Sequence, residues 1–186
     1  MNDIKETVIE HIYGDNWWGV STSEWTWRNK ILKLKDKFPE LYVAKSEKYK
    51  DRPQTMQYFI SKLACLWNDV LHLSPVDPAE LKRALVEAGF QPKELKFFQV
   101  DPDLLDPSKT TVYLFAEQNR VTDLQPGDFV DYDPSKLPEY SAVSQVTKDY
   151  YKESKEAGKI PKAFVGVPHI LHKGPIDISD LEVITV

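Results

Sequence analysis

The spacing of apolar residues changes near residue 90, and this change constrains the fold more than any other feature of the sequence. Before residue 90, apolar residues recur at intervals of three and four, which is typical of helices that bury one face. After it, short runs rich in aromatic and β-branched residues alternate with turn residues, which is typical of strands. The pattern predicts an α+β fold, in which a helical N-terminal half packs on a small, mostly antiparallel sheet with one further helix.

We expect residues 1–90 to form a helical subdomain and residues 91–186 a β-rich α+β subdomain. The clearest helix signal is Asp77, which can cap a helix with Pro78 at its first position and Gly89 at its end. The helices predicted in the first half cover residues 2–13, 22–38, 53–73 and 77–88.

The second half carries one amphipathic stretch, residues 141–157 with Gly158 behind it, which predicts a helix among strands. Clusters of proline, glycine and aspartate separate the strand candidates. The predicted strands cover residues 95–100, 110–117, 128–132, 163–167 and 181–186.

The formal net charge of -5 is distributed unevenly. Lysine and arginine balance aspartate and glutamate at 13 to 13 in residues 1–90, whereas residues 91–186 hold 11 cationic and 16 anionic side chains. Residues 28–52 hold nine cationic and four anionic side chains, a local charge of +5. This stretch is the one basic patch that the sequence offers.

Composition narrows the class of protein. A chain with 41% hydrophobic and 28% charged residues is typical of globular proteins. No apolar run reaches the roughly 18–20 residues of a bilayer span, and the N-terminal residues lack the order of a signal peptide. We therefore expect a cytoplasmic protein with no membrane partner. Cys65 is the single cysteine, so we expect neither an internal disulfide nor a thiolate zinc site.

The predicted helix 22–38 combines cationic side chains with tryptophan, and two further tryptophans precede it. Cationic side chains can neutralise phosphates while aromatic rings stack on bases. The same segment can equally be an amphipathic helix with a solvated basic face. The candidate binding residues are Trp17, Trp18, Trp25, Arg28, Lys30, Lys33, Lys35 and Lys37.

His169, His172 and Asp177 form a second candidate, because two imidazoles and a carboxylate can hold zinc. Residues three apart share a face on a helix, but they point to opposite faces of the extended chain expected here. The favoured interpretation is ordinary surface or half-buried histidines, and metal binding is left open. We expect no catalytic set, no resident metal and no cofactor.

Two acidic clusters lie beside proline or glycine, where aspartate commonly caps a turn. Neither cluster follows the pattern of the twelve-residue calcium loop, so turn capping is favoured over a cation site. Cys65 lies among apolar residues, where burial makes a thiol unreactive. The clustered residues are Asp101, Asp103 and Asp106, and Asp128, Asp131 and Asp133.

Two stretches resemble known groups of proteins. The run Val20-Ser-Thr-Ser-Glu24, followed by Asn29-Lys-Ile and Lys37-Phe-Pro39, resembles the start of small uncharacterised phage and mobile-element proteins of Gram-positive bacteria. This resemblance implies a genomic context and no particular chemistry.

The run Thr111-Val-Tyr-Leu-Phe, followed by residues 124–130 and Tyr140, resembles phage-borne domains related to ADP-ribosyltransferases. In that family an arginine after the strand tyrosine holds the dinucleotide, and a late glutamate orients the ribose. Leu114 occupies the arginine's place in this chain, and Glu182 can imitate the late glutamate but lacks the motif around it.

Our leading hypothesis is a non-catalytic binding or regulatory protein of phage or mobile-element type. It would dock a protein or a nucleic acid through the basic, tryptophan-bearing helix 22–38. The alternatives are a divergent ADP-ribosyltransferase-like enzyme and a structural or assembly component of a particle, for which the chain would be a homo-oligomer.

Overall fold

The computed structural model describes residues 57–114 and 124–186, together with residues 39–40, 43, 47 and 50. The predicted helices 2–13 and 22–38 lie outside these residues. Within the part described, no helix is long and apolar enough to cross a membrane.

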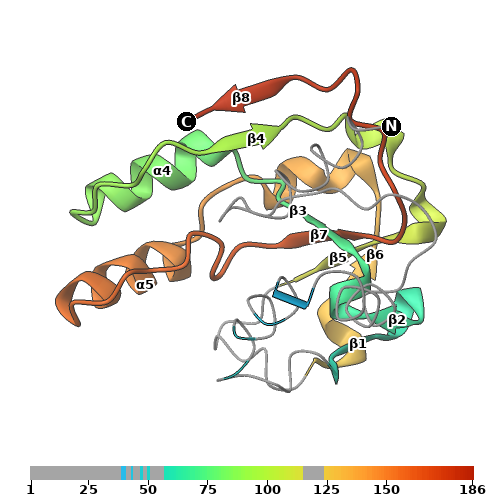
Figure 1. Cartoon of the computed structure of the whole chain (residues 1–186), viewed down its shortest axis with the longest axis horizontal. Coiled ribbons are helices and arrows are strands. Elements are labelled where there is room, and N and C mark those ends of the chain that lie inside the picture. Colours follow the sequence, from blue (N-terminus) through green and yellow to red (C-terminus); the bar gives the residue numbers. More distant parts are fainter. Residues whose placement is uncertain (1–38, 41–42, 44–46, 48–49, 51–56, 115–123) are drawn as a thin grey trace.

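The strands are short and pair in antiparallel groups. Their bounds are β1 (Phe59–Ile60), β2 (Cys65–Leu66), β3 (Leu71–Leu73), β4 (Lys96–Phe98), β5 (Thr110–Tyr113), β6 (Phe129–Asp131), β7 (His169–His172) and β8 (Val183–Thr185). The central four-stranded sheet has the order β3-β7-β5-β6. The β4–β8 pair lies on one side of this sheet and the β1–β2 pair on the other (Figure 1).

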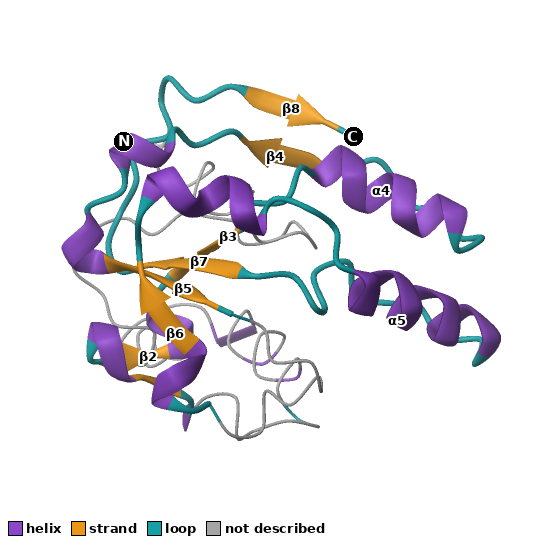
Figure 2. Cartoon of the chain, turned by 180° about the vertical axis from the view of Figure 1, so that it is seen from behind, coloured by secondary structure: helices purple, strands orange, loops and turns teal. Residues whose placement is uncertain are grey.

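Two α-helices lie side by side at one end of the sheet, α4 (Pro78–Glu87) and α5 (Gln145–Glu156) (Figure 2). Tyr151 of α5 is fully buried and packs on Ala84 and Leu85 of α4. Short 3-10 helices connect the other elements. They are η2 (Ser61–Leu63), η3 (Trp67–Asp69), η4 (Pro102–Leu104), η5 (Pro107–Lys109), η6 (Pro126–Asp128) and η7 (Pro134–Tyr140).

The prediction of helix 77–88 is confirmed, because the Asp77 carboxylate accepts a hydrogen bond from the Ala79 N–H at 2.8 Å and caps α4. The second-half helix also forms, but it begins later than residue 141. Ser144 caps it, with the Ser144 hydroxyl accepting from the Thr147 N–H at 3.1 Å.

The predicted fold class is wrong in its helical first half. Residues 57–73 do not continue the predicted helix 53–73, because they form β1, β2 and β3 with η2 and η3 between them. Ala64 adopts a left-handed conformation with φ 47°, which interrupts any helix. The Asp69 carboxylate accepts from the Leu66 N–H at 3.1 Å and closes the next turn. The apolar residues that match helical spacing therefore belong to separate strands.

Four strand predictions are confirmed within the described residues, because the ranges 95–100, 110–117, 128–132 and 181–186 contain β4, β5, β6 and β8. The predicted strand 163–167 is wrong, and β7 begins at His169 instead. Gly166 explains the difference, because its φ of +75° turns the chain against α5. A Cβ atom at Gly166 would come within 2.8 Å of Thr147 Oγ1.

The two faces of the central sheet bury separate apolar clusters. Side chains alternate along β7, so Leu171 packs with the β1–β2 side whereas Ile170 packs on the opposite side with Val112 and Tyr132. Ile60, Leu63, Cys65, Val70, Tyr113, Phe129 and Leu171 form the first cluster. Leu105, Val112, Tyr132 and Ile170 form the second.

We predict that Asp77→Ala lowers the free energy of unfolding by about 1 kcal/mol, because the first turn of α4 loses its side-chain cap. Asp77→Asn keeps an acceptor oxygen and is the matched control, with a smaller expected loss. Urea denaturation of the three proteins measures the difference. Equal stability of wild type and Asp77→Ala would contradict the role of this cap.

Candidate functional site

A cleft of about 740 Å³ lies between the central sheet and the β4–β8 pair. It falls within the roughly 300–1,000 Å³ that is usual for small-molecule sites. Its walls come from β3, the turn before α4, β4, η7 and the chain between β7 and β8. Both ribbon views show the β4–β8 pair on one side of the central sheet (Figures 1 and 2).

The β4–β8 pair contributes Phe97, Phe98 and Ile184 to the lining of the cleft. Phe97 lies opposite Ile184, so these two side chains share a face, and both line the cleft. Gln99 follows Phe97 by two residues and lines the same face. Val183 precedes Ile184 and points the other way, with 51% of its surface exposed. The ring of Phe164 lies 6.3 Å from that of Phe97 and extends this wall.

The opposite wall of the cleft is the face of the central sheet that carries Ile170. Leu73 of β3 lies directly opposite Ile170 of β7, and both line the cleft. Ile176 and Ile178 follow β7 and add two further aliphatic side chains. The cleft is therefore lined mainly by apolar side chains from segments far apart in the sequence.

Most polar groups of this lining already have partners. The Tyr132 hydroxyl donates to the Pro102 carbonyl at 2.9 Å, and burial raises the pKa of Tyr132 to about 12. The Ser74 hydroxyl accepts from the Val76 N–H at 3.1 Å and donates to the Val76 carbonyl at 3.3 Å. The Asp77 carboxylate caps α4. What the cleft offers a ligand is chiefly apolar contact.

The structure does not test the binding residues predicted from the sequence. Trp17, Trp18, Trp25, Arg28, Lys30, Lys33, Lys35 and Lys37 all lie outside the described residues. The prediction that they dock a partner therefore stays a prediction.

His169 and His172 point to opposite faces of β7, as the extended chain predicts. Both are buried, and Asp177 instead accepts from the Ser179 N–H at 3.0 Å. In residues 57–114, 124–186 and the few described before them, no group of three or more His, Cys, Asp or Glu side chains is placed to hold a metal ion.

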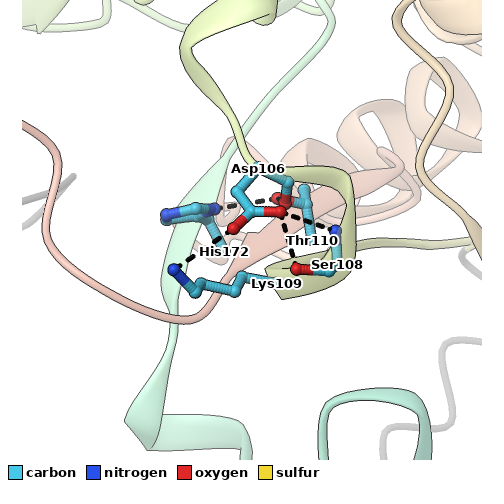
Figure 3. Close-up of polar contacts among 5 residues, drawn as sticks. All are labelled: Asp106, Ser108, Lys109, Thr110 and His172. Atoms are coloured by element: carbon cyan, nitrogen blue, oxygen red, sulfur yellow. Dashed lines mark hydrogen bonds and ion pairs between the residues drawn. The ribbon is translucent and has the colours of Figure 1, made fainter.

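His172 belongs to a polar cluster that joins β7 to the start of β5 (Figure 3). The Thr110 hydroxyl donates to the Asp106 carbonyl at 2.7 Å and accepts from His172 Nδ1 at 2.8 Å. The Asp106 carboxylate accepts from the Ser108 hydroxyl and backbone N–H and lies 3.2 Å from Lys109 Nζ. The Ser108 hydrogen bonds, with help from Lys109, lower the pKa of Asp106 to about 2. The polar groups of this cluster therefore find their partners within it, and the cluster fixes the position of β5 beside β7.

Two histidines, His72 and His169, lie on the face of the sheet opposite to His172. The ring centroids of His72 and His169 are 6.0 Å apart, and those of His72 and Trp67 are 4.8 Å apart. His72 Nε2–H donates to the Trp67 carbonyl at 3.0 Å. Burial lowers the pKa of His72 to about 4. Burial, together with the nearby His72, lowers the pKa of His169 to about 3, so both rings are neutral at pH 7.

Turn capping by aspartate is confirmed at most positions of the acidic clusters. Asp101 accepts from the Asp103 N–H, Asp133 from the Ser135 N–H, and Asp128 from the Gln125 N–H. Asp131 differs, because it forms an ion pair with Lys62. Cys65 is buried as expected, although in β2 and not in a helix, and burial raises the pKa of its thiol to about 11.

Sequence reasoning missed the cleft residues. A signal was present in the final eleven residues, where Ile176, Ile178 and Ile184 recur at even spacings and so share one face of an extended chain. The strand partner of Ile184 is Phe97, which lies far earlier in the chain, and no local pattern connects the two.

No family model, no curated protein and no solved structure matches this chain. The resemblances to phage proteins and to ADP-ribosyltransferases therefore stay hypotheses. Of the residues that carry the second one, Tyr113 is buried in the sheet and Leu114 packs against the cluster around Ile170. Glu182 is exposed just before β8.

We predict that acid weakens the fold between pH 7 and pH 5 through His72 and His169. Their folded pKa values lie below the ordinary value of about 6.5, so the unfolded chain binds more protons as the pH falls. The stabilising contribution is complete above pH 7 and is lost as the pH falls toward 4, by roughly 1–2 kcal/mol for each histidine at pH 5.

Urea denaturation of wild type and His72→Gln at both pH values measures this effect. Glutamine can still donate to the Trp67 carbonyl but does not titrate. The variant should lose less stability than wild type between pH 7 and pH 5. An equal loss in the two proteins would contradict the assignment. Protonation of Asp106 does not contribute to the loss of stability between pH 7 and pH 5, because its pKa of about 2 lies far below this range.

Proposed function

We propose that this protein is a non-catalytic binding protein whose cleft takes a small, largely apolar ligand. The observation that supports the proposal best is a ligand-sized cleft of about 740 Å³ between the sheet and the β4–β8 pair. Burying apolar surface contributes roughly 25 cal/mol per Å², so a lining of this kind favours an apolar body over a polar one.

The walls of the cleft are held in place independently of a ligand. On one side, the β4–β8 pair is extended by reciprocal hydrogen bonds between Leu95 and Val186, both at 2.9 Å. On the other side, β3 pairs with β7 along its whole length. Prolines, whose φ angles are fixed, make up part of the lining: Pro75, Pro78, Pro102, Pro134 and Pro138. A preformed site loses less conformational entropy when a ligand binds than a site that must become ordered around the ligand.

The role of helix 22–38 is a separate hypothesis. Docking of a protein or a nucleic acid by that segment, and a phage or mobile-element setting, are compatible with a ligand-binding cleft elsewhere in the chain. Binding through its lysines would weaken steeply with added salt, whereas binding of a neutral ligand in the cleft would not.

The test uses Nile red, a neutral dye whose fluorescence increases in apolar surroundings. We predict saturable binding of one dye per chain, weakened at least tenfold by Ile184→Trp, because the larger side chain fills the cleft. Val183→Trp is the matched control, since it adds the same ring to the neighbouring residue on the outer face of β8. This control should bind the dye as wild type does.

Two results would contradict the proposed function. One is the absence of saturable dye binding to the folded wild-type chain. The other is an equal effect of Ile184→Trp and Val183→Trp, which would place the dye on the outer surface.

A further inference from the structure

We infer that the cleft selects an electrically neutral ligand, an apolar chain or ring that ends in an uncharged hydrogen-bonding group held by the Gln99 amide. This inference rests on the proposed function and adds the chemistry of the ligand. It is carried by the charges of the lining and by Gln99, which among the described lining residues is the polar side chain that has no hydrogen-bond partner in the described part of the chain.

The described part of the lining provides no counter-charge for an anion. Among the described residues that line the cleft, none is lysine or arginine, and the one carboxylate is that of Asp77. An anionic group would leave water for apolar surroundings with no lysine or arginine of the described lining to pair with it, and this opposes binding. Fatty acids and other carboxylates are therefore disfavoured.

A cation is disfavoured for a different reason. The Asp77 carboxylate already accepts the Ala79 N–H at 2.8 Å and lies at the N-terminus of α4. The partial positive charge of the helix N-terminus offsets the negative charge that would attract an ammonium group. An amine entering the cleft would lose its hydration without gaining a full ion pair.

Gln99 supplies the polar contact. It lies two residues after Phe97 on the cleft face of the β4–β8 pair, and its backbone N–H donates to the Glu182 carbonyl at 2.9 Å. Its side-chain amide has no hydrogen-bond partner among the described residues, unlike the Ser74 and Tyr132 hydroxyls. Gln99 is also exposed, which places it at the mouth of the cleft. An amide both donates and accepts, so it matches an alcohol, an amide or a ketone.

These contacts define one orientation of the ligand in the cleft. The ligand's apolar body lies against Phe97, Ile184 and Ile170, and its neutral head group stays beside Gln99 at the solvent edge. This arrangement buries the apolar part and leaves the polar part hydrogen-bonded.

The experiment displaces bound Nile red from the full chain with octanol, octanoate and octylamine at pH 7.5. The three share one alkyl chain, so their differences report on the head group. Octanol should displace the dye at a concentration at least tenfold lower than either charged compound. Displacement by octanoate or octylamine at the same concentration as octanol would overturn the inference, while dye binding itself would leave the proposed function standing.

Gln99→Leu tests the named contact. It should weaken octanol binding roughly three- to tenfold, as expected for one lost hydrogen bond, and leave octanoate binding nearly unchanged. Gln91→Leu is the matched control, because Gln91 is also exposed but is not among the residues that line the cleft. Unchanged octanol affinity in Gln99→Leu would overturn the role of the amide. Because Gln99 is exposed, both variants are expected to fold, and a third variant, Gln99→Asn, should recover part of the affinity.

Discussion

Pairing of β7 with both β3 and β5 is the interaction on which the rest of the structure depends. All four residues of β7 are buried, with Leu171 fully inaccessible, and each strand beside it comes from a distant part of the sequence. Removing β7 would separate β3 from β5 and β6, and it would open both apolar clusters. The Thr110–His172 hydrogen bond fixes one end of this pairing.

The same pairing creates the cleft. Because side chains alternate along a strand, β7 gives Leu171 to the cluster beneath the sheet and Ile170 to the floor of the cleft. The chain then leaves the sheet, passes Ile176 and Ile178, and returns as β8, which pairs with β4 to form the opposite wall. One C-terminal segment thus contributes to the floor, the side and the roof of the site. A cleft between two hydrogen-bonded walls keeps its shape without a ligand, which suits a binding protein.

What could be predicted from the sequence was local. Asp77 and Pro78 mark the start of α4 because the cap and the proline act within one turn, and the aspartates beside proline cap their turns for the same reason. The helix predicted over 53–73 was wrong because its apolar spacing is compatible with two structures. Pairing with β7, about 100 residues later, selects strands over a helix for Leu71–Leu73. The cleft could not be predicted because Leu73, Phe97, Ile170 and Ile184 meet only through such long-range pairing.

The most direct measurement of the central claim is nuclear Overhauser contact between a bound neutral ligand and methyl-labelled isoleucines of the full chain. If the cleft between the sheet and the β4–β8 pair is the site, octanol shows contacts to the methyl groups of Ile170 and Ile184, which come from opposite walls. Contacts confined to Ile160, which is 94% exposed and lies outside the cleft, would contradict it.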